Sequence, residues 1–123
     1  MKKTFKTLAL VGATLFASST FATDLVCDVY AKGNGNSFGN GTQNCNAFDF
    51  SFGNSTSGKF YLKNISKPIN KVIWSGGAKC NGGTSCSVTV RAYSGNSASA
   101  TILYKDGTYE VTNTARMSYE TGH

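Results

Sequence analysis

The sequence predicts an all-β fold of about seven antiparallel strands, arranged as a sandwich stapled by two disulfides. Seven segments after residue 22 alternate apolar and polar side chains, the period of a half-buried strand. No segment after residue 22 has the period of an amphipathic helix. Four cysteines in about 100 residues indicate a small, cross-linked domain.

Residues 1–22 are predicted to be a bacterial signal peptide. A basic start (MKKTFK) precedes a short apolar stretch and small residues, with cleavage expected after Ala22. The apolar stretch, residues 7–17, has 11 residues, whereas a membrane-spanning helix needs about 20. We therefore expect one mature domain, residues 23–123, secreted to the periplasm or the cell exterior, with no membrane span.

The four cysteines predict two disulfides, for which three pairings are possible. Two consecutive glycines let the chain reverse between Cys80 and Cys86, so that local bridge is favoured and Cys27 is left to pair with Cys45. The successive spacings are 18, 35 and 6 residues and no histidine lies nearby, so a zinc site is not expected. We expect no metal and no cofactor.

The first strand is expected at residues 24–32, with Cys27 on one side and Asp28 on the other. Nine of the fourteen residues 33–46 are Gly or Asn, so this segment, called the excursion below, is expected to be a loop. A Cys27–Cys45 bridge would hold its two ends together. Four further strands are expected, at residues 47–53, 58–65, 71–75 and 86–93.

A hairpin is predicted at the end of the chain, where Asp106-Gly107 separates two β-rich segments, residues 98–104 and 109–120. With these two residues as the turn, three pairs face each other: Tyr104 with Tyr109, Ile102 with Val111, and Ala98 with Ala115. Asn113 interrupts the apolar face of the second strand and is expected to mark a bulge or a buried amide.

The apolar side of each alternating segment supplies the predicted core. Its members are Phe48, Phe50, Phe60, Leu62, Trp74, Val88, Val90, Ile102, Val111 and Met117.

Three segments carry a resemblance to bacterial secreted immunoglobulin-like and PKD-like domains: KVIWSGG with Trp74, SCSVTVRAY, and the final hairpin YKDGTYEVTNTARMSYE. The resemblance implies an Ig-like sandwich over nearly the whole mature chain. The alternative is a small Greek-key barrel. The chain departs from the antibody pattern, because neither expected bridge is placed to staple the two sheets around Trp74.

Charge and residue content exclude several classes of function. Three of the twelve Lys and Arg lie in the signal segment, so the mature chain carries nine against six acidic residues, too few for a nucleic-acid binder. The single histidine is the terminal His123, which is poorly placed for nucleophilic or acid–base catalysis. Asp28, Asp49 and Glu110 are expected on solvated strand faces. The sequence therefore predicts a protein that is not an enzyme.

Two sets of residues are candidates for binding. Phe38 lies in the middle of the polar excursion and either anchors a partner or folds back to cap the core. Outward positions carry Tyr61 with Lys63, Arg91 with Tyr93, and Arg116 two residues before Ser118; the alternative is an ordinary solvated sheet face.

These features predict a secreted, non-enzymatic binding module that is monomeric and has a protein or glycan partner at the cell surface. Two alternatives are open. One is a small secreted inhibitor of a hydrolase, of the lysozyme or protease type, that inserts a disulfide-bounded loop into an active site. The other is a pilus-like structural subunit, although this chain supplies all its predicted strands itself.

Overall fold

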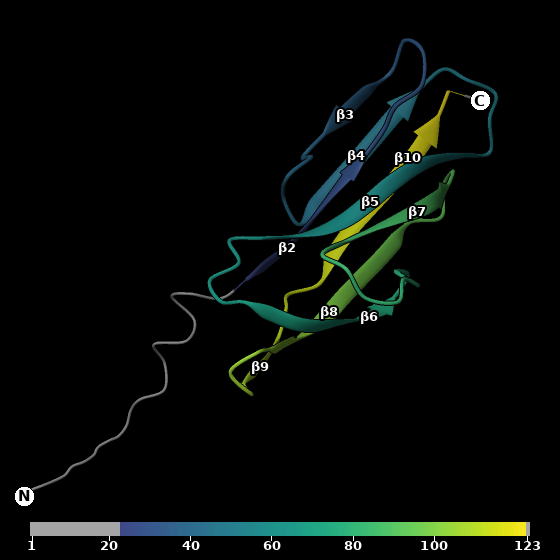
Figure 1. Ribbon diagram of the computed structural model, residues 1–123. Coiled ribbons are helices and arrows are strands. Elements are labelled where there is room, and N and C mark those ends of the chain that lie inside the picture. Colours follow the sequence, from purple (N-terminus) through teal and green to yellow (C-terminus); the bar gives the residue numbers. More distant parts are fainter. Residues whose placement is uncertain (1–22, 123) are drawn as a thin grey trace, which may run out of the picture.

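The computed structural model describes residues 23–122, so the predicted signal peptide and His123 lie outside the described residues. Nine strands form two layers that pack face to face (Figure 1). The strands are β2 (Asp24–Val29), β3 (Asn36–Phe38), β4 (Asn44–Asp49), β5 (Ser55–Lys63), β6 (Ile69–Gly76), β7 (Ser85–Arg91), β8 (Asn96–Tyr104), β9 (Tyr109–Val111) and β10 (Ala115–Thr121).

The smaller sheet has the order β2-β5-β7, and the larger has the order β3-β4-β10-β8-β6, with β9 also paired to β8. The strands form two separate sheets, not one closed barrel. The predicted all-β sandwich is confirmed, with one departure: β4 and β10 are parallel, whereas the other pairs are antiparallel. The chain passes from β2 in one sheet to β4 in the other, and β4 then lies alongside the last strand.

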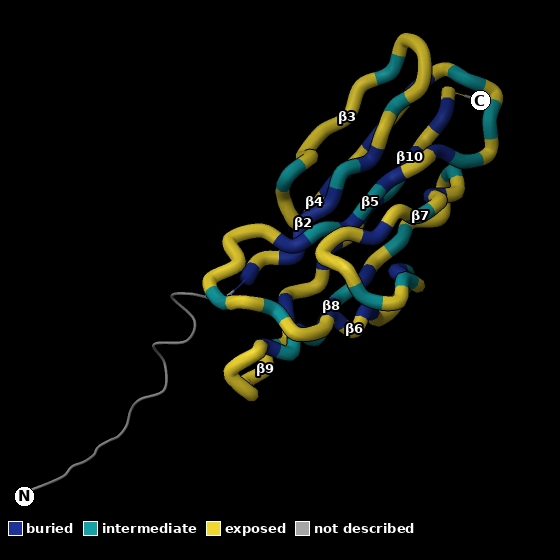
Figure 2. Tube along the Cα trace, in the orientation of Figure 1, coloured by how far each residue is buried: buried dark blue, intermediate teal, exposed yellow. Residues whose placement is uncertain are grey.

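The core lies between the two sheets, and buried residues alternate with more exposed ones along the strands (Figure 2). Most of the predicted core is confirmed. Buried members are Phe60, Leu62, Trp74, Val90, Ile102 and Met117, and Val88 is partly buried against them.

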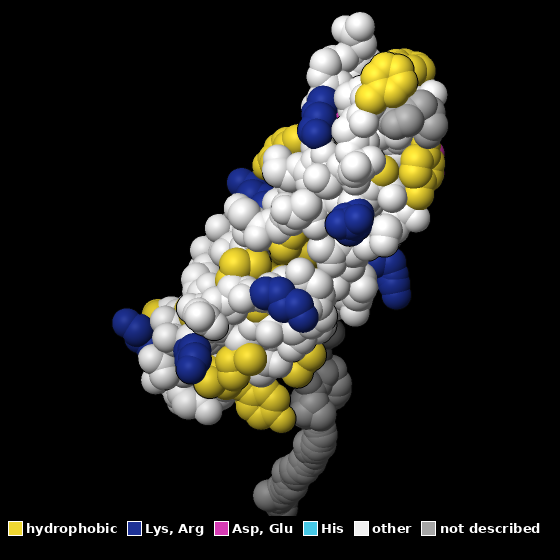
Figure 3. Space-filling model, turned by 90° about the vertical axis from the view of Figure 1, so that its right-hand side faces the viewer, with side chains coloured by type: hydrophobic (Ala, Val, Ile, Leu, Met, Phe, Trp, Pro, Cys, Tyr) yellow, Lys and Arg dark blue, Asp and Glu magenta, His cyan; other side chains and the backbone are white. Residues whose placement is uncertain are grey.

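The prediction was wrong for Phe48 and Phe50, which are 37% and 65% exposed. Burial of Cys45 decides which side of β4 faces the interior. Alternate residues share a side, so Ala47 and Asp49 are buried as well, while Phe48 faces outward. Hydrophobic side chains gather at the upper end of Figure 3, the end at which β4 finishes and the chain terminates.

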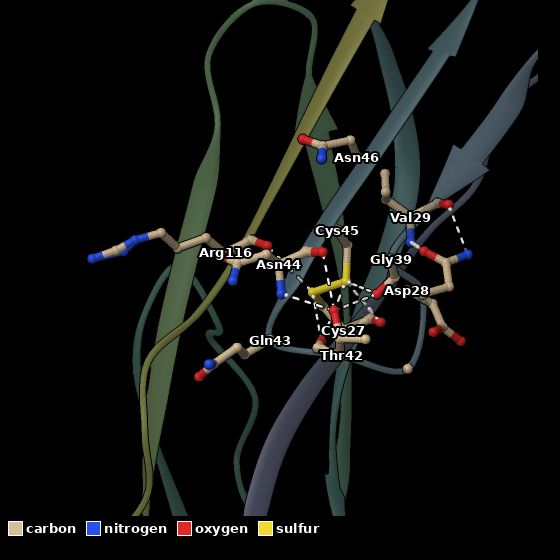
Figure 4. The surroundings of a disulfide bond; sticks show 12 residues. Cys27, Asp28, Val29, Gly39, Thr42, Gln43, Asn44, Cys45, Asn46 and Arg116 are labelled. Atoms are coloured by element: carbon tan, nitrogen blue, oxygen red, sulfur yellow. Dashed lines mark hydrogen bonds between the residues drawn. A yellow bond between two sulfur atoms is a disulfide. The ribbon is translucent and has the colours of Figure 1, made fainter.

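Both predicted disulfides are present, Cys27–Cys45 and Cys80–Cys86. One of them joins the two sheets, because Cys27 lies on β2 and Cys45 on β4 (Figure 4). It does so three strands away from β6, the strand that carries Trp74. Both of these cysteines are buried, so the bridge is part of the core.

The hairpin of β8 and β9 is shifted by one residue from the prediction, because Ile102 pairs with Glu110 and not with Val111. A two-residue type I′ turn needs positive φ at both positions, but only Gly107 has it, at 89°. The turn therefore takes a third residue. A shift of one residue exchanges the two faces of a strand, so Val111 is 63% exposed and was wrongly placed in the core.

A bulge between β9 and β10 restores the predicted register, and Ala115 pairs with Ala98. Asn113 lies in this bulge, so the first of its two predicted roles is confirmed. Its side chain is exposed, so it is not a buried amide. Its amide replaces a strand partner for Leu25: Leu25 N–H donates to Oδ1 at 3.0 Å, and Nδ2 donates to the Leu25 carbonyl at 2.9 Å.

The excursion is not wholly a loop, because it contains β3, which pairs with β4. Its tip also lies along the free edge of β2. The Asn40 amide accepts from Val29 N–H at 3.0 Å and donates to the Val29 carbonyl at 3.2 Å. Cys27 exchanges backbone hydrogen bonds with Thr42 and Gly41 at 2.9 and 2.8 Å. The Gly- and Asn-rich segment is thus ordered by pairing with a strand.

Removing the bridge between the sheets with the double variant Cys27→Ala/Cys45→Ala is expected to lower the free energy of unfolding by about 3 kcal/mol. The reason is that a closed separation of 18 residues restricts the unfolded chain. The Cys80–Cys86 bridge closes a shorter loop of separation 6, so Cys80→Ala/Cys86→Ala is expected to cost about 2 kcal/mol. Urea unfolding measures both, and a wild-type midpoint for the first variant would contradict this expectation.

Candidate ligand-binding face

The outer surface of β3, β4 and β10 combines amide, hydroxyl, guanidinium and aromatic side chains in register, and the carboxylate of Glu120 lies at one end, paired with Phe48. Phe38 pairs with Asn46, which pairs with Ser118; in the next row Asn44 pairs with Arg116. Phe48 faces the same side, two residues beyond Asn46. We call this set the amide face: Phe38, Asn44, Asn46, Phe48, Arg116 and Ser118.

Strand alternation places these side chains outward. Ala115, Met117 and Tyr119 of β10 are buried, so Arg116 and Ser118 point away from the core. In Figure 4 the side chains of Arg116 and Asn46 point away from the Cys27–Cys45 bridge.

A groove of about 540 Å³ runs over this face, in the size range of small-ligand sites. It is lined by Asn44, Cys45, Asn46, Gly95, Asn96, Ser97, Arg116, Met117 and Ser118. No carboxylate is among these lining residues. The groove therefore offers amide and hydroxyl groups with a single positive charge.

Much of the hydrogen-bonding capacity of the groove is unused. Ser118 Oγ donates to Asn46 Oδ1 at 2.5 Å, which leaves the Asn46 NH₂ group facing solvent. Within residues 23–122, neither the Arg116 guanidinium nor the Asn44 side-chain amide has a hydrogen bond or an ion pair. These groups are available to a ligand.

Exposed aromatic rings lie on or near the amide face, outside the residues that line the groove. Phe38 is 58% exposed, so it does not cap the core. The rings of Phe48 and Phe50 meet edge to face at 5.0 Å between centroids. Phe52 is 82% exposed and follows them along the chain. Large contiguous patches of exposed apolar side chains are common at interaction sites.

Asp49 lies behind the amide face and is fully buried, contrary to the predicted solvated position. Its carboxylate accepts hydrogen bonds from Tyr119 OH at 2.8 and 2.9 Å, from Lys32 N–H at 2.8 Å, and from the hydroxyl and N–H of Ser51 at 2.7 and 3.0 Å. Burial alone would raise the pKa of this carboxyl, but these bonds lower it from 3.8 to about 2. An ionised, fully bonded carboxylate is a structural anchor for the end of β4.

The remaining predicted site residues do not join this face. Tyr61 and Lys63 lie on the outer side of the smaller sheet. Tyr61 OH donates to Asp28 at 3.1 Å, Lys59 Nζ lies 5.1 Å from its ring centroid, and burial and then Asp28 raise the Tyr61 pKa. Lys63 Nζ contacts the Gly41 carbonyl at 3.4 Å. These contacts resemble ordinary cross-strand pairing.

Arg91 and Tyr93 lie at the far end of the smaller sheet, where Arg91 pairs with Ser55. Tyr93 is 63% exposed, has a φ of 62°, and donates through its hydroxyl to the Thr121 carbonyl. The structure therefore separates the predicted candidates into three places, and only Phe38 and the Arg116–Ser118 pair come together.

Sequence reasoning missed Asn44, Asn46 and Phe48, because the first two were assigned to a loop and Phe48 to the core. The available signal was Cys45, since a cysteine in a predicted disulfide is buried and its immediate neighbours in a strand then face solvent.

Residues 23–122 contain no cluster of three or more His, Cys, Asp or Glu side chains that could hold a metal ion. Across the same residues, no helix reaches the length and apolarity that a membrane crossing requires.

No family model, no curated protein and no solved structure matches this chain.

Proposed function

We propose that this chain is a secreted, non-enzymatic, Ig-like binding module that captures a protein or glycan at the cell surface through the amide face. The observation that carries the proposal is the pair of exposed rings, Phe38 and Phe48, beside a groove of unpaired amide and guanidinium groups. Rigid aromatic side chains and Arg are the groups that most often anchor partners.

Strand order supports the Ig-like part of the proposal. β2, β5 and β7 correspond in order and sheet to strands A, B and E of an Ig domain, and β6, β8 and β10 correspond to C, F and G. A disulfide-bounded connection between β6 and β7 stands where strand D would be. The two disulfides support an oxidising location, outside the cytoplasm.

β4, the central strand of the amide face, is held at both ends, which favours binding. β4 is held by the Cys27–Cys45 bridge at its start and by the Asp49 hydrogen bonds at its end. A surface that is already ordered loses little entropy when a partner binds.

Phe38→Ala is expected to change the free energy of unfolding by less than about 0.5 kcal/mol, because an exposed ring contributes little to the core. It should reduce capture of the partner about tenfold or more, as loss of an anchor residue does. A melting curve and a pull-down from culture surface extracts measure the two effects on the same preparation.

Tyr109→Ala is the matched control, because Tyr109 is 69% exposed and lies on β9, outside the amide face. Early melting of Phe38→Ala would show that the ring supports the fold. Equal capture by the wild type and Phe38→Ala would move the binding surface elsewhere.

A hydrolase inhibitor is the second candidate, supported by one observation. The loop between Cys80 and Cys86 is closed by a disulfide, and Trp74 Nε1 donates to the carbonyls of Gly82 and Gly83 at 3.1 and 3.2 Å. A loop restrained in this way suits insertion into an active site. Inhibition assays against a lysozyme and a serine protease distinguish this candidate from a binding module.

A further inference from the structure

We propose that the ligand of the amide face is an acidic polysaccharide, with Arg116 binding a sugar carboxylate and the neighbouring amides binding sugar hydroxyls. This inference rests on the proposed function, and it specifies the chemical class of the ligand.

The charge of the groove favours an anion. Arg116 is exposed on β10, and the groove that it lines contains no carboxylate. Glu120, four residues further along the same strand, is about 13 Å away at the usual rise per residue, too far to form an ion pair with it. A guanidinium without an acidic neighbour can hold a carboxylate through two parallel hydrogen bonds.

The neutral groups of the groove match hydroxyl groups. A sugar hydroxyl both donates and accepts hydrogen bonds, and the side chains of Asn44 and Asn46 also offer both. Ser118 and Ser97 add hydroxyls on the neighbouring strands. Adjacent strands are about 4.8 Å apart. A ligand that lies across β4, β10 and β8 therefore meets a polar side chain on each of these three strands.

Phe38 supplies the apolar contact that a sugar ring needs. It lies opposite Asn46 on β3, the edge strand of the larger sheet (Figure 1). The face of an aromatic ring carries partial negative charge and attracts the weakly positive C–H groups of a pyranose. Because β3 ends the sheet, a long polymer can continue past Phe38 without meeting another strand.

Other anionic ligands fit less well. Nucleic acids require a cluster of basic residues, whereas Arg116 is the only cation lining the groove. An acidic peptide added as a strand would need unpaired backbone groups, but this face presents side chains.

The test uses the mature protein and three probes: tetragalacturonic acid, its fully methyl-esterified form, and poly-L-glutamate. The ester has a methyl group on each carboxyl and therefore no negative charge, and the two probes are otherwise the same. Calorimetry at low salt is expected to show binding of the acid, with the ester and poly-L-glutamate at least about tenfold weaker.

Arg116→Gln is expected to weaken binding of the acid about 10- to 100-fold and to leave binding of the ester unchanged. Asn46→Ala should weaken both sugars by a similar factor, about five- to tenfold. Arg91→Gln is the matched control, because Arg91 is an exposed arginine on the other sheet, and it should bind like the wild type. Melting curves establish that each variant is folded.

Equal affinity for the acid and the ester, an Arg116→Gln variant that binds the acid normally, or equally tight binding of poly-L-glutamate would each overturn the proposal. If no sugar probe binds while capture from surface extracts still depends on Phe38, the acidic glycan is wrong and the binding module stands. If capture is also independent of Phe38, both proposals fail.

Discussion

Asp49→Ala is expected to lower the free energy of unfolding by about 4 kcal/mol or more. The variant leaves the donors on Tyr119, Ser51 and Lys32 without their acceptor. The Tyr119 hydroxyl is buried and the other donors are partly buried, and a buried donor left unsatisfied costs about 1–3 kcal/mol. Urea unfolding at pH 7 measures the loss, and a decrease below about 1 kcal/mol would show that the carboxylate is dispensable.

The same carboxyl predicts a dependence on pH. Its pKa is about 2 in the folded protein and near 3.8 when unfolded, so folding favours the ionised form. The resulting stabilisation, about 2 kcal/mol, is present above about pH 5 and is lost as the pH falls towards 2. Asp49→Ala lacks this dependence. The gap between the wild type and the variant should therefore narrow in acid, and a constant gap would contradict the assignment.

Trp74→Ala is expected to lower the free energy of unfolding by about 3–5 kcal/mol, because it leaves a large cavity between the sheets. Trp74 is 8% exposed and belongs to the central core cluster. Its indole N–H also donates to two carbonyls of the disulfide loop that precedes β7. Loss of the ring therefore removes packing and loosens the connection between the sheets.

Trp74→Phe separates these two contributions. A phenylalanine keeps much of the packing but has no N–H, so a cost of about 1–2 kcal/mol is expected from the missing hydrogen bonds. Calorimetric melting of both variants is the measurement. Equal destabilisation by alanine and phenylalanine would mean that the hydrogen bonds to the loop dominate, and a wild-type curve for alanine would contradict the core assignment.

The sequence predicted the strand-rich architecture and the disulfides well, because alternation and cysteine spacing are local signals. The side of β4 that faces the core could not be read in the same way. Phe48 and Phe50 are far more apolar than Ala47 and Asp49, so hydrophobicity alone selects the wrong side. The correct side depends on the bridge from Cys45 to a distant strand and on donors that come from three separate segments.

The final hairpin illustrates the limit of turn chemistry. Asp106-Gly107 correctly marks the reversal, yet the number of residues in the turn depends on which of them adopts positive φ. Because the turn has three residues, the outward and inward faces of β9 are exchanged relative to the prediction. The bulge at Asn113 then restores the predicted register of β10 with β8. The third turn residue and the bulge at Asn113 are only a few residues apart and cancel each other's shift. The alternation of apolar residues in β8 and β10 therefore gives no sign of either.

The side-chain amides along β2 have a consequence for how this domain could be shortened. Asn40 and Asn113 occupy backbone groups of an edge strand that would otherwise be open to another chain. The excursion is rich in glycine and asparagine, so its sequence alone suggests that it could be shortened to a tight turn without affecting the fold. Such a shortening would instead free the backbone groups that Asn40 now occupies and expose an edge of β2 that can pair side by side with another copy. The excursion therefore also protects the domain against aggregation.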